Sequence, residues 1–336
     1  MTIKDEVKAL WKLCFKDSDE FTDLYFSMRY KDEINMAVRR DGKIISALQM
    51  IPYPMTFCGE VIATSYISGA CTHPDEREHG AMRQLLKETH RRMYEQGILL
   101  STLIPAEEWL LGYYAKSGYA PGFGYAVERV QAEGLHPSFT CRVEVCTSPD
   151  AEHYRYFETR MCGRQSCIQH PKEDFVVIMA DLKLAHGQLL VAREGDNIVG
   201  MAFTVMDGDV LYIKELLADT DAVKDALLYQ AAHIYNVRAM DYFVPSSADT
   251  LFLGMARVIH AESLLVLFAR KYPAAALYIR IEGDDVIPEN NGYYTVEKGV
   301  CLRKQLPDKK YHTYTLACFA RLLLEAEHPY MSLMLN

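Results

Sequence analysis

The stretch ISGACTHPDEREHGAMRQLLKETHRRMYEQG, residues 67–97, carries the clearest structural signal in the chain. It begins as a strand-like run, passes through a short charged segment to Gly80, and continues as an amphipathic helix that Gly97 closes. The N-terminus of a helix presents free amide N–H groups and the positive end of the helix dipole, and both favour an anion. The stretch therefore predicts a strand–turn–helix unit whose turn binds phosphate.

The segments on either side extend this unit into an alternating α/β pattern. Residues 5–31 are predicted to be helical, and residues 34–57 form two apolar runs around Asp41-Gly42, which is a strong hairpin signal. After the central helix, ILLSTLIPA is a buried strand, EEWLLGYYAKSG is a helix that ends at Gly118, and YAVERVQAE is a strand.

A weaker copy of that order follows. DFVVIMADLKLA is predicted to be a helix, the three runs between residues 187 and 219 to be strands, and DAVKDALLYQAAHIYNVR to be a helix. The helix that starts at Asp221 follows LLADT, which contains no glycine and no basic residue. Anionic residues at a helix N-terminus are good caps and poor phosphate ligands, so this copy keeps the fold without the chemistry.

The C-terminal part has a third pattern. Residues 255–272 and 313–324 are predicted to be helices, and residues 276–299 to be two strands around a polar turn.

Composition excludes several classes of function. A net charge of −9 over 336 residues argues against a nucleic-acid binder, and no apolar run approaches the roughly 20 residues that span a bilayer. The nine cysteines form no CxxC pair, and no secretory signal opens the chain, so we expect reduced thiols and a cytoplasmic protein. Cys162, Cys167 and His170 are close in sequence, but a structural zinc site needs a fourth ligand, and we expect no metal.

The stretch resembles the acetyl-CoA signature of the GCN5-related N-acetyltransferase (GNAT) superfamily, an Arg/Gln-x-x-Gly-x-Gly/Ala turn between a strand and a helix. Here the turn is Arg77-Glu78-His79-Gly80-Ala81-Met82, with Met82 in place of the usual small residue. YYAKSGYAPG follows at the interval that the family shows.

The whole chain resembles a narrower group, the Eis-like acetyltransferases. The resemblance implies mixed α/β tandem GNAT folds, the second degenerate, followed by a sterol-carrier-like α+β domain. The implied domains are a catalytic domain (1–130), a degenerate domain (131–250) and a C-terminal domain (251–336). Eis-like proteins commonly form hexamers, so a homo-oligomer is possible.

The resemblance also implies how an acetyl-CoA co-substrate is held. The pyrophosphate is expected against the residues from Glu78 to Arg83, and the pantetheine arm along the strand end. The expected cofactor-binding residues are Ala70, Cys71, Thr72, Arg77, Glu78, His79, Gly80, Ala81, Met82 and Arg83. The alternative for Arg77 and Arg83 is that they decorate a solvated helix start. A backbone N–H near Cys71 or Thr72 is expected to polarise the thioester carbonyl.

Two groups are expected to move protons. Tyr114 matches the tyrosine that serves the family as general acid, with Tyr113 as the fallback because only one of two adjacent rings on a helix can face the thioester. In the Eis-like group the terminal carboxylate is the base, which here belongs to Asn336. The alternative is that the apolar tail packs on the last helix, and another alternative makes Cys71 a nucleophile.

The predicted function is acetyl transfer to a primary amine. The acceptor is a small-molecule amine, such as an aminoglycoside-like polyamine, or a lysine-like side chain. Two alternatives remain open, a non-catalytic protein that binds an apolar ligand in its third domain, and a sensor that binds acyl-CoA without turnover. The enzyme needs Tyr114 and a free C-terminus, whereas the binding protein tolerates changes at both.

Overall fold

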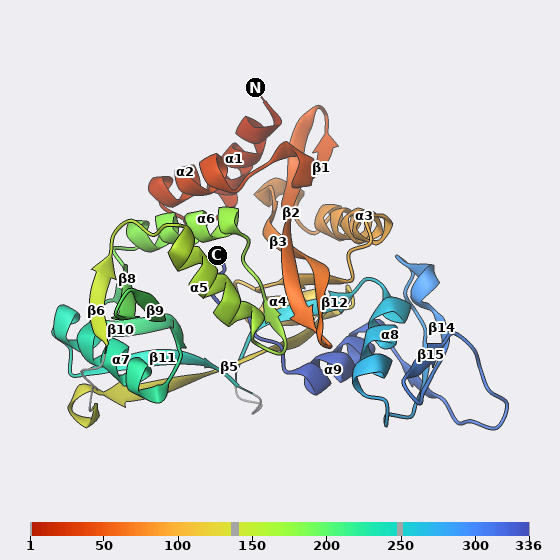
Figure 1. Ribbon diagram of the computed structural model, residues 1–336. Coiled ribbons are helices and arrows are strands. Elements are labelled where there is room, and N and C mark those ends of the chain that lie inside the picture. Colours follow the sequence, from red (N-terminus) through yellow and green to blue (C-terminus); the bar gives the residue numbers. More distant parts are fainter. Residues whose placement is uncertain (1, 136–140, 247–250, 336) are drawn as a thin grey trace. The chain divides into compact units, whose positions relative to one another are not determined.

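The computed structural model describes residues 2–135, 141–246 and 251–335, and it divides the chain into two compact units (Figure 1). The first unit comprises Met1–Phe123 and Phe252–Pro329, and the second comprises Gly124–Leu251 and Tyr330–Leu335. The C-terminal elements thus group with the first unit, and the last six described residues with the second. A compact unit can hold more than one domain, so the three-domain division stays a prediction.

The N-terminal part of the first unit follows the predicted order. Its elements are α1 (Ile3–Cys14), α2 (Asp19–Met28), a 3₁₀ turn (Asp32–Ile34), β1 (Asn35–Arg40), β2 (Lys43–Phe57), β3 (Glu60–Thr72), a second 3₁₀ turn (Pro74–Glu76), α3 (Ala81–Glu95), β4 (Leu100–Leu103), α4 (Trp109–Ala115) and the start of β5 (Ala120–Gln131). Asp41 and Gly42 both have positive φ in the β1–β2 hairpin, as the sequence predicted. The strand order is β1-β2-β3-β4, and β4 is followed in the sheet by β12 (Leu251–Val258).

Strand β3 carries the irregularity that shapes the later site. It pairs with β2 in antiparallel register, and that register shifts between Ala47 and Gln49, opposite the segment that contains Gly69. Gly69 has a φ of 60°, and a Cβ there would lie 2.0 Å from the Trp11 ring. The bulge therefore needs a glycine both for its backbone conformation and for the close packing of α1.

The C-terminal part of the first unit consists of β12 (Leu251–Val258), α8 (Ala261–Lys271), β13 (Leu277–Ile281), a 3₁₀ turn (Pro288–Asn290), β14 (Gly292–Glu297), β15 (Val300–Leu302), β16 (His312–Tyr314) and α9 (Leu316–Glu327). A separate four-stranded sheet has the order β15-β14-β13-β16. The prediction of one helix over residues 255–272 was wrong at its start. Met255–Val258 are a strand because they pair with β4, and this long-range pairing overrides the helix propensity of Met, Ala and Arg.

One hydrophobic core joins both parts of the first unit. Leu85, Leu86 and Met93 of α3 pack there with Tyr114 of α4 and with residues of β2, β3 and β4. The same core contains three residues from the C-terminal part, Met255, Ile259 and Ile287. Helix α3 and the end of α4 are therefore held in place by core residues from both the N-terminal and the C-terminal part of the first unit.

The second unit contains the rest of β5, a 3₁₀ turn (Ala132–Gly134), β6 (Arg142–Cys146), α5 (Ala151–Cys162), β7 (Cys167–Ile168), α6 (Lys172–Leu184), β8 (Gln188–Glu194), β9 (Asn197–Asp207), β10 (Val210–Ala218), α7 (Asp221–Tyr235) and β11 (Ala239–Pro245). The strand order is β5-β11-β10-β9-β8-β6. Thr220 caps α7 with its side chain, which agrees with a copy of the fold whose helix start is closed to phosphate.

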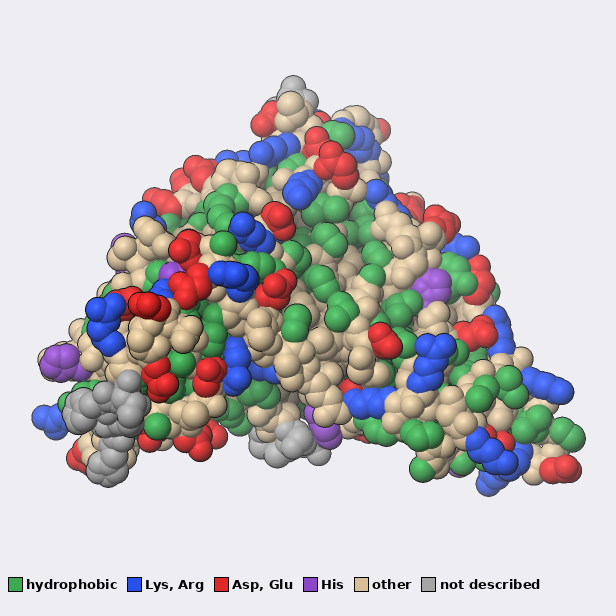
Figure 2. All heavy atoms as spheres, viewed as in Figure 1, with side chains coloured by type: hydrophobic (Ala, Val, Ile, Leu, Met, Phe, Trp, Pro, Cys, Tyr) green, Lys and Arg blue, Asp and Glu red, His purple; other side chains and the backbone are tan. Residues whose placement is uncertain are grey.

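No helix within the described residues combines the length and the apolar character needed to cross a bilayer. On the face shown in Figure 2, acidic and basic side chains are interspersed.

Candidate functional site

A pocket of about 570 Å³ lies in the first unit between the end of β3, the N-terminus of α3 and helix α4, and we call it the α3 pocket. It brings together ten of the residues that the sequence predicted, namely Ala70, Cys71, Thr72, Arg77, Glu78, Gly80, Ala81, Met82, Arg83 and Tyr114. His79 is exposed and is not among the residues that line it. Residues from several separate segments of the chain thus share one cavity.

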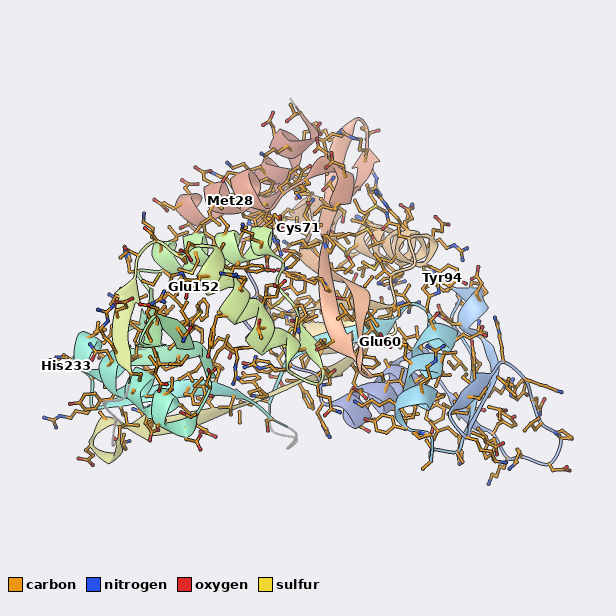
Figure 3. The ribbon with its side chains drawn as sticks, in the orientation of Figure 1. Met28, Glu60, Cys71, Tyr94, Glu152 and His233 are labelled. Carbon is orange, nitrogen blue, oxygen red and sulfur yellow. The ribbon has the colours of Figure 1, made fainter. Side chains whose placement is uncertain are left out.

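The end of β3 forms one wall of this pocket, at the point where β3 is no longer paired with β4. The last pair between β3 and the parallel strand β4 is Tyr66 with Thr102, whereas β3 itself continues to Thr72. Beyond Tyr66 the backbone of β3 has no partner in β4, so the edge of β3 that faces β4 is free to hydrogen-bond a ligand there. Ala70, Cys71 and Thr72 line the pocket there (Cys71 is labelled in Figure 3).

The turn before α3 presents the helix start to the pocket. Glu78 has a φ of 67° and Gly80, the N-cap residue, a φ of 82°. No side chain caps this end and its first turn holds no acidic residue. A Cβ at Gly80 would meet no atom within 4 Å, so the left-handed backbone requires the glycine here. The uncapped start of α3 has the geometry of an anion site.

Two arginines flank this helix start. The Nε of Arg77 donates a hydrogen bond to the carbonyl oxygen of Thr72 at 3.3 Å, which holds the turn against the end of β3. The Arg83 side chain is exposed on the first turn of α3. Both side chains line the pocket, so both add positive charge where the helix dipole is positive.

Tyr113 and Tyr114 both line the pocket, and they differ in environment. Tyr114 is 8% exposed and burial raises its pKa to about 12, whereas Tyr113 is half-buried and burial raises its pKa against the opposing charge of Arg83. Their ring centroids are 5.4 Å apart at an interplanar angle of 81°, so the rings present different faces. A phenol with a raised pKa stays protonated near neutral pH and is able to donate a proton.

Cys14 is a site residue that the sequence reasoning missed. It ends α1, lines the pocket, and donates its thiol hydrogen to the carbonyl oxygen of Thr72 at 3.3 Å. A hydrogen bond from the Cys71 thiol, with help from Arg77, lowers the pKa of Cys14 to about 6, and the same contact raises the pKa of Cys71 well above its usual value. No local signal in the sequence places Cys14 beside Cys71, because only the packing of α1 on β3 does so.

The tail before Asn336 is buried in the second unit, and Asn336 itself lies outside the described residues. Tyr330 exchanges backbone hydrogen bonds with Ser166 and Ile168 at 3.0 Å. The Ser332 hydroxyl donates to Glu215 at 2.6 Å, and the Ser332 carbonyl lies 3.0 Å from Nε2 of His170. The tail is buried as its composition predicted, with the second unit as its partner, where the sequence left the last helix as an alternative.

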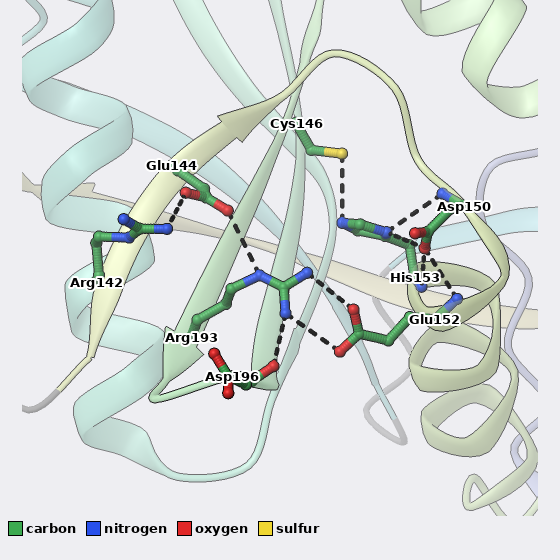
Figure 4. Close-up of polar contacts among 8 residues, drawn as sticks. All are labelled: Arg142, Glu144, Cys146, Asp150, Glu152, His153, Arg193 and Asp196. Carbon is green, nitrogen blue, oxygen red and sulfur yellow. Dashed lines mark hydrogen bonds and ion pairs between the residues drawn. The ribbon is translucent and has the colours of Figure 1, made fainter.

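The described residues contain one group of side chains with the proximity of metal ligands. Asp150, Glu152 and His153 place ligand atoms within 4.8 Å of one another (Figure 4). All three side chains already have protein partners. Asp150 and His153 form the capping box of α5, and Glu152 forms an ion pair with Arg193 at 3.0 Å. Cys162, Cys167 and His170 do not form such a group among the described residues.

Comparison with known proteins finds a family profile that matches part of the chain and solved structures that share the fold of nearly all of it. Residues 3–122 match the sequence profile of the family described as "Acetyltransferase (GNAT) domain". No curated protein matched the chain.

Three solved structures illustrate the shared fold. A probable N-acyltransferase from Enterococcus faecalis V583 has a TM-score of 0.77 at 16% identity, covering 96% of this chain and 87% of that chain. A GCN5-related N-acetyltransferase from Anabaena variabilis ATCC 29413 has a TM-score of 0.76 at 15% identity, covering 97% and 96%. Eis1 from Mycobacterium abscessus has a TM-score of 0.74 at 12% identity, covering 95% and 86%. At these identities the likeness concerns the fold, and it confirms the predicted mixed α/β tandem GNAT architecture.

Proposed function

We propose that the α3 pocket binds acetyl-CoA and that the chain transfers the acetyl group to a primary amine, because residues 3–122 match the profile of acetyltransferase (GNAT) domains. One observation carries the proposal. The uncapped start of α3, the end of β3 beyond its pairing with β4, and the Tyr114 ring come from three separate segments and line a single cavity. These are the three parts that acyl transfer from a phosphate-bearing thioester needs.

The donor is held at its phosphates. The amides of Ala81, Met82 and Arg83 stand at the positive end of the α3 dipole, and the Arg77 and Arg83 side chains add charge. The pantetheine arm then follows Ala70 to Thr72 along β3, where the backbone beyond Tyr66 is free of β4.

Acetyl transfer proceeds by direct attack of the amine on the thioester carbonyl. A backbone N–H near Cys71 or Thr72 stabilises the negative charge that develops on the carbonyl oxygen. The C–S bond then breaks, and Tyr114 gives its proton to the departing CoA thiolate. The Tyr114 pKa of about 12 keeps that proton in place at neutral pH.

A base is needed because an alkyl amine with a pKa near 10.4 is mostly protonated at neutral pH. The α-carboxylate of Asn336 is the proposed base, on the strength of the resemblance to the Eis-like group. The buried anchoring of Tyr330 and Ser332 supports a tail with a defined position. The sterol-carrier-like character of residues 251–336, a homo-oligomer, and an aminoglycoside-like, polyamine or lysine-like acceptor are proposals of the same origin.

The test is isothermal titration of acetyl-CoA into the untagged full-length protein. We expect micromolar binding that Gly80→Glu abolishes, because the new carboxylate repels phosphate at the start of α3. Gly42→Glu is the matched control, since Gly42 also has a positive φ and open space around it. No binding at millimolar acetyl-CoA would contradict the proposal. Binding without thiol release in an amine screen would favour the acyl-CoA sensor.

A further inference from the structure

Two cysteines meet at the wall of the α3 pocket. Cys14 is the last residue of α1, Cys71 lies near the end of β3, and both line the pocket. Both are free thiols, and the Cys71 thiol donates a hydrogen bond to the Cys14 sulfur, which brings the two sulfur atoms into contact. Two free thiols in contact are able to form a disulfide once an oxidant reaches one of them.

The packing of α1 on β3 holds this pair together. Trp11 of α1 lies so close to Gly69 of β3 that a Cβ on the glycine would be 2.0 Å from the Trp11 ring. Cys71 is held in the sheet because β3 pairs with β2 at this position. Cys14 is at a helix end, since Phe15, the residue after it, has an extended backbone. A small shift of this helix end brings the two sulfurs within bonding distance.

The two thiols differ in their exposure. Cys14 is half-buried, whereas Cys71 is 5% exposed. A small oxidant that enters the pocket therefore meets Cys14 first. The hydrogen bond from Cys71, aided by Arg77, lowers the pKa of Cys14 to about 6, so that this sulfur is mostly a thiolate at neutral pH. The thiolate is the form that a peroxide oxidises.

Cys71 becomes the second reactant once Cys14 is oxidised. In the reduced protein its hydrogen bond to Cys14, its burial and the negative charge of the Cys14 thiolate all raise the pKa of Cys71 well above the usual value. A sulfenic acid on Cys14 is neutral, so its formation removes the charge behind the first and third of these effects. The pKa of Cys71 then falls towards that of an ordinary buried thiol, and Cys71 is already in contact with the sulfur that it must attack.

We propose that Cys14 and Cys71 are a peroxide-sensitive pair, in which Cys14 is oxidised first and Cys71 then closes a reversible disulfide at the wall of the α3 pocket. In the first step the Cys14 thiolate attacks an oxygen of hydrogen peroxide, an S–O bond forms, the O–O bond breaks and hydroxide leaves. In the second step the Cys71 sulfur attacks the Cys14 sulfur, the S–S bond forms, the S–O bond breaks, and hydroxide leaves with the Cys71 proton as water. The two thiols together lose the two electrons that the peroxide gains. Neither step requires acyl-CoA, so the pair is independent of the proposed acetyl transfer.

The experiment adds an equimolar amount of hydrogen peroxide to the reduced full-length protein at pH 7, blocks the remaining thiols with iodoacetamide, and maps the peptides by mass spectrometry without reduction. The wild type is expected to give the Cys14 peptide linked to the Cys71 peptide, and dithiothreitol should restore both thiols. Cys318→Ala is the control, because Cys318 is exposed and lies outside the α3 pocket, and it should leave the yield of the linked peptide unchanged.

Cys71→Ser separates the two steps. Serine keeps a hydrogen-bond donor beside Cys14 and forms no disulfide, so the Cys14 sulfenic acid should persist and be trapped by dimedone. In the wild type, dimedone should label Cys14 about tenfold less, because Cys71 consumes the sulfenic acid. Cys14→Ser should leave Cys71 reduced, because burial shields Cys71 and no activated thiol remains beside it.

The wild-type peptide map is decisive even without a variant. Linked Cys14 and Cys71 peptides in the wild type, absent from both serine variants, confirm the pair. Cys14 oxidised to a sulfenic or sulfinic acid with no link to Cys71 overturns the disulfide. Cys318 oxidised while Cys14 stays reduced overturns the activation of Cys14 and the pair with it.

Discussion

The thiols of Cys14 and Cys71 are hydrogen-bonded to each other at the wall of the α3 pocket, although one ends α1 and the other lies near the end of β3. The contact shifts the two pKa values in opposite directions. It lowers the pKa of Cys14 to about 6 and raises the pKa of Cys71 well above its usual value. Cys14 is therefore the thiol with nucleophilic character in this pocket, whereas the sequence had drawn attention to Cys71.

Cys14 is expected to be alkylated first by iodoacetamide at pH 7. With a pKa of about 6 its thiolate fraction at that pH is about 90%, against a few per cent for an ordinary thiol. Its alkylation rate should rise from pH 5 and level off above pH 7, because deprotonation is then complete. Peptide mass spectrometry over a time course measures this.

Cys71→Ala provides the matched variant, because it removes the hydrogen bond that lowers the Cys14 pKa. The midpoint of the Cys14 rate should then move up towards the ordinary thiol value of about 8.5. Preferential labelling of the exposed Cys318 in the wild type at pH 7 would show that Cys14 is not activated.

Tyr114→Phe is expected to lower kcat by about 10²-fold or more with little change in KM, because it removes a proton donor that acts only in the transition state. Tyr113→Phe is the control and should keep kcat within about twofold, since the ring planes lie at 81° to each other and Tyr114 is the proposed acid. Steady-state kinetics by thiol release measures both. A Tyr114→Phe enzyme within about twofold of the wild type refutes the acid assignment.

The wild-type activity should also persist at high pH. A general acid works only while it is protonated, and burial raises the Tyr114 pKa to about 12. We therefore expect no loss of kcat from this group between pH 8 and about 10, where an ordinary tyrosine begins to ionise. A decline with a midpoint near 9 would indicate a different acid.

Extending the chain beyond Asn336 is expected to lower kcat by about 10²-fold, because the terminal carboxylate is then replaced by a neutral amide. The same residues added before Met1 serve as the control. Binding of acetyl-CoA should be unchanged in both proteins. Full activity in the C-terminally extended protein would remove the carboxylate from the mechanism.

Gly69→Ala is expected to lower the free energy of unfolding by about 3 kcal/mol, because its Cβ would lie 2.0 Å from the Trp11 ring in a backbone with a φ of 60°. Gly42→Ala isolates the backbone effect, since Gly42 has a similar φ of 78° and nothing within 4 Å. That variant should cost about 1 kcal/mol. Urea unfolding compares them, and equal losses would show that the contact with Trp11 carries no penalty.

Several elements of the fold depend only on local chemistry and can be predicted from the residues alone. The Asp41-Gly42 hairpin, the amphipathic helix α3 and its start at Gly80 all follow from residues within a few positions of each other. Turn residues and hydrophobic periodicity act over such distances, so these elements could be predicted from the chain alone. The residues from Ala70 to Arg83 that line the α3 pocket could be predicted for the same reason, because they adjoin the turn before α3.

Other features depend on contacts between residues that are far apart in the chain. Met255–Val258 form a strand because they pair with β4. Cys14 lies beside Cys71 because α1 packs on β3. The tail at residues 330–335 packs within the second unit. Arg257 likewise meets Ser117 and Asp284 only in the folded chain. Such contacts depend on which surfaces the fold buries together, and local propensity is too weak to specify them.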